Sequence, residues 1–189
     1  MADRNKVEFG ISQLHVGTYT VDSTTGTVVL GTPYHQAGAV NLSLEPESDE
    51  NSFYADNIKY WSGFSDNGFT GSIEVAKFDL DFKKEFFGYQ ETADGGFAAI
   101  KGANKPNVYI AFQTEGDTEG RRVILYNVAM GGINREFATI EDSKEPVTET
   151  TDITVVGDNA TGITMASYAP ADTGYATLFT APPVPALKP

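Results

Sequence analysis

The chain contains no cysteine, few basic residues and no long apolar run. Without cysteine it has no disulfide, no thiol nucleophile, no thiolate zinc site and no iron–sulfur cluster. No stretch approaches the roughly 20 apolar residues of a membrane-spanning helix, so we expect no membrane insertion. The opening residues MADRNKVEFG lack the apolar core of a secretory signal peptide, so nothing in them indicates export.

Basic residues are half as numerous as acidic ones. Against 26 Asp and Glu there are 13 Lys and Arg, which gives a net charge of −13. This average charge repels nucleic acid phosphates and argues against tight binding to DNA. The only two histidines, His15 and His35, stand in no spacing that supports a Ser–His–Asp set or a metal site. We therefore expect a protein that is not an enzyme, with no catalytic residue, no metal ligand and no cofactor.

What the sequence does contain is typical of a folded, mainly β protein. Short β-branched and aromatic runs alternate with clusters of Gly, Asn, Asp and Pro. The predicted fold is a β-sandwich or partly open barrel with one short flanking α-helix. That helix is predicted over 79–89, because Asp79 is a candidate N-cap, Gly88 a stop, and phenylalanines recur between them at helical spacing. We expect a β domain over 1–157 and an Ala/Thr/Pro-rich extension over 158–189.

Two segments, 39–48 and 145–157, alternate in a way that predicts strands with two different faces. The mainly apolar faces are Val40, Leu42 and Leu44 in the first segment and Val147, Glu149, Thr151, Ile153 and Val155 in the second. The polar faces are Asn41, Ser43 and Glu45 in the first and Thr148, Thr150, Asp152 and Thr154 in the second. Glu149 is the one acid on an apolar face, which predicts a place at an interface or near a strand end.

Two further segments predict turns. The polar run EPESDENS (45–52) is expected to be a loop, because Pro46 cannot donate to a strand ladder and four acids crowd the run. The dipeptide Asn67–Gly68 is the strongest short hairpin signal in the chain.

Several stretches, in a constant order, resemble the major tail tube proteins of long-tailed phages that infect Gram-positive bacteria. The most specific is GAVNLSLEPESDENSFYADN (38–57). The others are NKVEFGISQLHVGTYT (5–20), NGFTGSIEVAKF (67–78), EGDTEGRRVILYNV (115–128) and EPVTETTDITV (145–155). The resemblance spans residues 5–157 and is weaker beyond them.

This resemblance implies a tail-tube-type fold and a structural role in the virion tail. Members of the family form hexameric rings that stack into a hollow tube, and four strands of each subunit join an inner β-barrel. The tube houses the tape-measure protein during assembly and conducts genomic DNA at infection. The implied partners are further copies of the chain, the tape-measure protein, the distal tail (tail-tip) and tail-terminator proteins, and DNA in transit without tight binding. The implied place of synthesis is the cytoplasm of the host bacterium.

Within this hypothesis the apolar faces pack on the subunit core and the polar faces line the channel. The lumen-facing candidates are Asn41, Ser43, Glu45, Thr148, Thr150, Asp152 and Thr154. The expected loop over 45–52 would point along the tube axis, with Glu47, Asp49, Glu50 and Asn51 as inter-ring contacts and Lys6, Lys59, Arg121 and Arg122 as candidate partners.

The alternative is a β-sandwich adhesin or carbohydrate-binding module on a virion or cell surface. Such a module would favour exposed Trp and Tyr clusters on a polar face. The single tryptophan, Trp61, lies within a strand pattern and is expected to pack in the core or in an interface.

Overall fold

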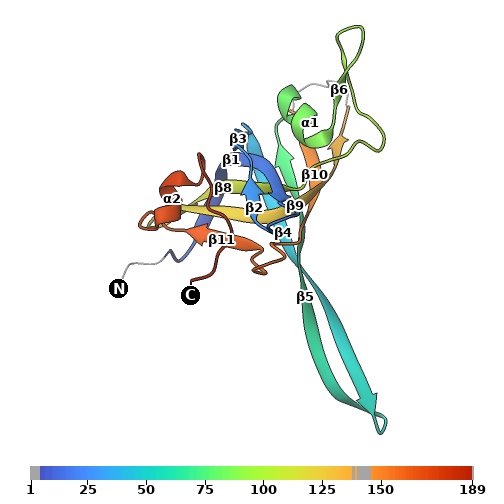
Figure 1. The fold of residues 1–189 in the computed structure, drawn as a ribbon, viewed down its shortest axis with the longest axis vertical. Helices are drawn as coiled ribbons and strands as arrows, with labels where there is room; N and C mark the ends of the chain where they lie inside the picture. The colour runs from blue at the N-terminus through green and yellow to red at the C-terminus, as the bar shows by residue number, and fades with distance from the viewer. Residues whose placement is uncertain (1–4, 138, 140–145, 189) are drawn as a thin grey trace.

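The computed structural model describes residues 5–137, 139 and 146–188 (Figure 1). They form a mainly β protein with a large antiparallel sheet and two short helices, α1 (Leu80–Phe87) and α2 (Thr173–Thr177). The strands are β1 (Glu8–Val21), β2 (Val28–Leu30), β3 (Tyr34–His35), β4 (Ala39–Ala55), β5 (Ile58–Val75), β6 (Gln90–Glu91), β7 (Phe97–Ala98), β8 (Val108–Gly116), β9 (Arg121–Arg135), β10 (Glu149–Val155) and β11 (Met165–Tyr168). The prediction of a mainly β fold is confirmed. Over the described ranges the sheet does not close into a barrel.

The large sheet has the order β2-β1-β8-β9-β10-β5-β4, and β9 divides it into two parts. Residues 121–128 of β9 pair with β8, whereas residues 128–135 pair with β10. β9 continues through Gly131 and Gly132 to Arg135. We call β4, β5, β10 and residues 128–135 of β9 the four-stranded part.

The helix α1 packs against the apolar side of the four-stranded part. Phe82 and Phe86 of α1 are buried in one cluster with Ile73 of β5 and Ile153 of β10. The ring centroids of Phe82 and Phe86 lie 4.7 Å apart. The helix ends where Gly88 adopts a φ of 67°, a conformation that favours glycine. The predicted helix is thus confirmed, and α2 is a second one that the sequence did not indicate.

The last thirty residues cover the other part of the sheet. β11 pairs with β9, and Leu178 is fully buried against Tyr109 and Tyr126. The Arg122 guanidinium lies 4.2 Å from the Tyr175 ring centroid and 4.3 Å from that of Phe179. These contacts fasten the C-terminal segment to the sheet. None of the helices formed by the described residues has the length and apolar character needed to cross a membrane.

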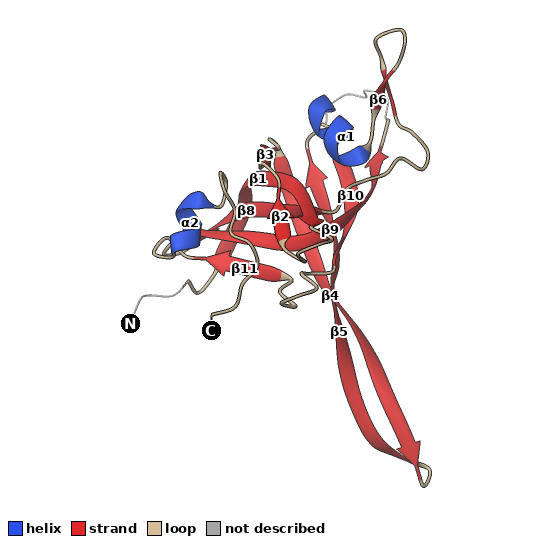
Figure 2. Cartoon of the chain, in the orientation of Figure 1, coloured by secondary structure: helices blue, strands red, loops and turns tan. Residues whose placement is uncertain are grey.

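Strands β4 and β5 continue past the sheet as a two-stranded projection, residues 47–66, which we call the arm (Figure 2). The expected loop over 45–52 is therefore wrong. Its residues pair with β5, so the backbone groups that face β5 are bonded to that strand, whereas those on the outer side of β4 face water. Pro46 is tolerated because β4 is an edge strand, whose outer side needs no donor.

The hairpin turn also lies elsewhere than predicted. The chain reverses at Asp56 and Asn57, whose φ values of 50° and 61° match the two-residue turns that suit the twist of a hairpin. Asn67 and Gly68 lie within β5, next to a register shift where the arm leaves the sheet. Gly68 has a φ of 99°, and its N–H donates to Asp66 Oδ1 at 3.1 Å.

Candidate assembly surfaces

One side of the four-stranded part is almost entirely polar. Ser43 lies opposite Ser72, which lies opposite Asp152, and the Oγ atoms of the two serines are 3.0 Å apart. The pairing of the strands brings further polar side chains side by side in the same way. We define the polar face as Asn41, Ser43 and Glu45 of β4, Thr70, Ser72 and Glu74 of β5, Thr150, Asp152 and Thr154 of β10, and Asn134 of β9. Six of the seven residues expected to face a lumen are thus brought onto one surface.

The seventh expected residue, Thr148, precedes β10. Its hydroxyl donates to Glu74 Oε1 at 2.6 Å, so it lies beside the polar face. Sequence reasoning missed the contribution of β5, although the alternation FTGSIEV already implied it. Asn134 had no such signal, because its position depends on strand β9 continuing past Gly132.

The opposite side faces the core, but two residues expected there do not pack against it: Val147, which precedes β10 and is 45% exposed, and Val40. Leu42 and Leu44 pack against the buried cluster as expected, and so do Ile153 and Val155. Val40 does not, and is half exposed. A bulge between Ala39 and Asn41 displaces it, so that Ala39 takes the core position instead.

The polar face carries charge of one sign. Its ionisable residues are Glu45, Glu74 and Asp152, and none of its ten positions holds Lys or Arg. An anion near this surface meets three carboxylates and hydroxyl groups but no fixed cation. The surface therefore disfavours phosphate binding.

Glu149, the acid on the apolar side, is the first residue of β10 and anchors α1. It pairs with Lys83 at 2.8 Å and with Arg135 at 3.0 Å, and accepts from the Phe78 N–H at 2.8 Å. Burial works against its ionisation, but these three donors outweigh it and hold the pKa of Glu149 below its usual value. The expected place near a strand end is confirmed.

The arm combines exposed aromatic side chains with acids. Phe53, Tyr54, Tyr60, Trp61 and Phe64 are all more than half exposed. The Trp61 indole lies over Gly63, where a Cβ would come within 2.7 Å of the ring. Core packing of Trp61 is therefore wrong, and packing in an interface stays a prediction.

The four expected inter-ring residues Glu47, Asp49, Glu50 and Asn51 all lie on the β4 strand of the arm. Glu50 forms an ion pair with Lys59 across the hairpin, and this contact lowers the pKa of the carboxyl group. Of the other cations suggested as their partners, Arg121 pairs with Glu119 at 3.7 Å and Arg122 stacks on the C-terminal segment. Lys59 therefore pairs with an acid of its own arm.

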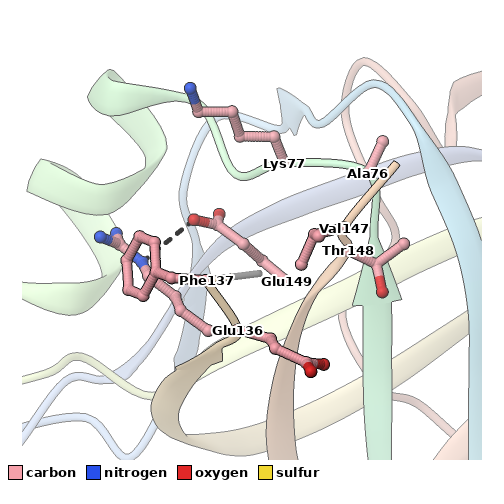
Figure 3. Close-up of a pocket in the computed structure, with 8 residues that line it drawn as sticks. Ala76, Lys77, Glu136, Phe137, Val147, Thr148 and Glu149 are labelled. Carbon is pink, nitrogen blue, oxygen red and sulfur yellow. Dashed lines mark ion pairs between the residues drawn. The ribbon is translucent and has the colours of Figure 1, made fainter. Parts of the chain in front are cut away.

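A shallow groove of about 170 Å³ lies at the opposite end of the four-stranded part (Figure 3). It is built where β5 and β9 end and where β10 begins. Its lining includes Lys77, Arg135, Phe137 and Val147. Phe137 is 90% exposed and Val147 is 45% exposed, so both present apolar surface to solvent.

Comparison with known proteins adds no further assignment. No protein-family model matches the chain. No curated protein matches it either.

Proposed function

We propose that this chain is the structural subunit of a phage tail tube, assembling as hexameric rings that stack around a channel. The channel would house the tape-measure protein and conduct DNA during ejection. The observation that carries the proposal is the four-stranded part, which has one acidic polar face and no paired strand, within the described residues, on either outer edge.

The strand directions permit such rings to close. All three pairings in the four-stranded part are antiparallel, so its two outer strands, β4 and β9, run in opposite directions. When copies are related by rotation about one axis, β4 of one copy meets β9 of the next in an antiparallel sense. Closure of this kind leaves no open sheet edge, which is a standard protection against uncontrolled pairing.

The dimensions and charge suit a channel for DNA. Six copies of four strands, at a strand spacing of about 4.8 Å, give a barrel about 37 Å across at the backbone before strand tilt widens it. With the apolar side on the subunit core, the polar face would line this barrel. Each ring would then present the carboxylates of Glu45, Glu74 and Asp152 from every copy. A negative wall repels phosphates, so DNA would pass without being held.

The arm supports a second candidate function, a carbohydrate-binding module on a virion or cell surface. Exposed aromatic rings such as Tyr60 and Trp61 are what a sugar-binding surface requires. This reading explains the arm but gives no role to the two open edges or to the acidic face.

Negative-stain electron microscopy of the purified chain separates the two candidates. A tail tube subunit forms rings or tubes with a central channel. Dispersed particles that bind immobilised glycans, and lose that binding when Trp61 is replaced by Ala, would support the second candidate and reject the first.

A further inference from the structure

We infer that protonation of His15 weakens the attachment of the C-terminal segment, from α2 onward, so that the segment is fastened at neutral pH and loosened in mild acid. The inference concerns the subunit itself and goes beyond the proposed function. It follows from a stack of planar side chains that joins this segment to the strands β1, β3 and β9.

The stack is centred on Phe179 of the C-terminal segment. The centroid of the Phe179 ring lies 4.4 Å from that of His15, with 12° between the two planes, and 4.3 Å from the Arg122 guanidinium. Arg122 also donates to the backbone oxygen of Tyr175 in α2. The His35 ring lies 4.8 Å from His15, to which it is paired across β3 and β1. Phe179 is therefore the contact through which a charge on His15 acts on the segment.

His15 is held in this stack as a neutral imidazole. The residue is 8% exposed. Its Nδ1 lies 2.7 Å from the carbonyl oxygen of Gln13, which can only accept, so Nδ1 carries the hydrogen and Nε2 is where a second proton would bind. Burial is the main cause that lowers the pKa of His15, and it outweighs the opposite effect of the bond to Gln13.

The charges that face His15 are of one sign. Arg122 on β9 and His35 on β3 both oppose a proton on His15. β8 places Ala111 opposite His15, the C-terminal segment places Phe179 against it, and neither side chain ionises. Among the residues that the structure describes, no carboxylate forms an ion pair with either histidine or with Arg122. A protonated His15 would thus be a buried cation beside a second cation.

The direction of the pH effect follows from the two states of the segment. When the segment is detached, His15 meets water and has an ordinary pKa of about 6.5. The attached state has the lower pKa, so the detached state binds more protons in mild acid. Attachment is therefore undisturbed well above about pH 6.5 and weakens as the pH falls from there toward the lower pKa of the attached state.

Limited proteolysis of the unassembled subunit with thermolysin tests this inference. The protease cuts before large apolar residues, and mass spectrometry measures the fragments released by cleavage at Leu178 or Phe179. We expect the cleavage rate of the wild type, divided by that of His15→Gln at the same pH, to rise about threefold or more between about pH 7.5 and pH 5.5. Dividing rates measured at one pH cancels the effect of pH on the protease itself.

The matched control is His35→Gln, which removes the other histidine and keeps His15. This variant should retain the pH dependence of the wild type. A ratio of wild-type to His15→Gln rates that stays constant over the range would overturn the inference, and so would loss of the pH dependence in both histidine variants. Neither result bears on the tube proposal, because the segment is followed in the unassembled subunit.

A second measurement leaves His15 in place and uses the reciprocal effect. Phe179→Ala removes the ring that covers His15, so an NMR titration of the His15 ring proton should show its midpoint rise toward about 6.5. The control Phe64→Ala removes an exposed ring of the arm and should leave the midpoint unchanged. The same midpoint in the wild type and in Phe179→Ala would overturn the inference.

Discussion

The ion pair between Lys83 and Glu149 gives the sharpest prediction for subunit stability. The Lys83 side chain is 3% exposed and that of Glu149 is 12% exposed, so neither charge is well solvated. Glu149→Gln keeps the shape and can still accept from the Phe78 N–H, but it removes the charge that balances Lys83. Leaving one partner of a buried pair uncompensated costs about 3–5 kcal/mol, a large share of the 5–15 kcal/mol that holds a typical domain together.

The assay is urea unfolding of the unassembled subunit, followed by far-ultraviolet circular dichroism. Tryptophan fluorescence is unsuitable, because Trp61 lies on the arm and does not report on the core. The double variant Lys83→Met/Glu149→Gln removes both charges and should recover a substantial part of the loss. Two results would refute the reasoning. One is a loss of unfolding free energy below about 1 kcal/mol for Glu149→Gln. The other is a double variant whose loss equals the sum of the losses of Lys83→Met and Glu149→Gln measured separately.

The same pair predicts a pH dependence. The pKa of Glu149 is lower in the folded subunit than in the unfolded chain, so near that pKa the unfolded chain binds more protons. The stabilisation is therefore complete above the unfolded value of about 4.3 and disappears as the pH falls through the lower folded value. The Glu149→Gln variant should lack this component of acid destabilisation, which urea titrations between about pH 5 and 2.5 would show.

Three further perturbations test other parts of the structure. Replacing Glu45 and Asp152 with lysine should leave tubes intact but make them retain DNA at low salt and slow ejection, and unchanged retention and kinetics would argue against an electrostatic role for the polar face. Gly71→Ala would place a Cβ 1.9 Å from a backbone oxygen of the neighbouring strand and should lower the free energy of unfolding by about 1–3 kcal/mol. The control Gly132→Ala places a Cβ with nothing within 4 Å and should change that free energy little. Equal losses for the two variants in urea titrations would contradict this. Arg122→Lys should weaken the attachment of the C-terminal segment, because lysine lacks the flat guanidinium that stacks on two rings. Faster proteolytic cleavage of the chain at sites after residue 158 would show this.

The sequence predicted those features that depend on local periodicity. The alternation over 39–48 and 145–157 assigns most side chains to the correct side of the sheet, and the capping pattern around 79–89 locates α1. Both signals act over a few residues, so neither needs knowledge of which strands are neighbours.

The errors arise where pairing between distant segments of the chain determines the local structure. The acidic composition of residues 45–52 is typical of a loop, and a strand that is exposed on both faces lacks the alternation of apolar residues that would identify it as a strand. Val40 is misplaced because a bulge depends on the partner strand. The turn at Asp56 and Asn57 had a usable signal, since both residue types tolerate a positive φ. The groove had none, because it joins three chain segments that are far apart in sequence.

The division of β9 between two sets of partners has a consequence for the order in which the subunit folds. Residues 121–128 can pair with β8 through a turn of four residues, 117–120, a closure of low entropic cost. The pairing of β10 with β5 joins residues more than seventy positions apart, such as Glu149 and Val75, and so forms slowly. The β4–β5 hairpin closes through the two-residue turn at Asp56 and Asn57, so the β4 edge can form early, and the step that comes late is the joining of this hairpin to β10. The acidic face is continuous only after that step, so a growing polymer that requires the whole face would recruit only molecules that have nearly completed folding.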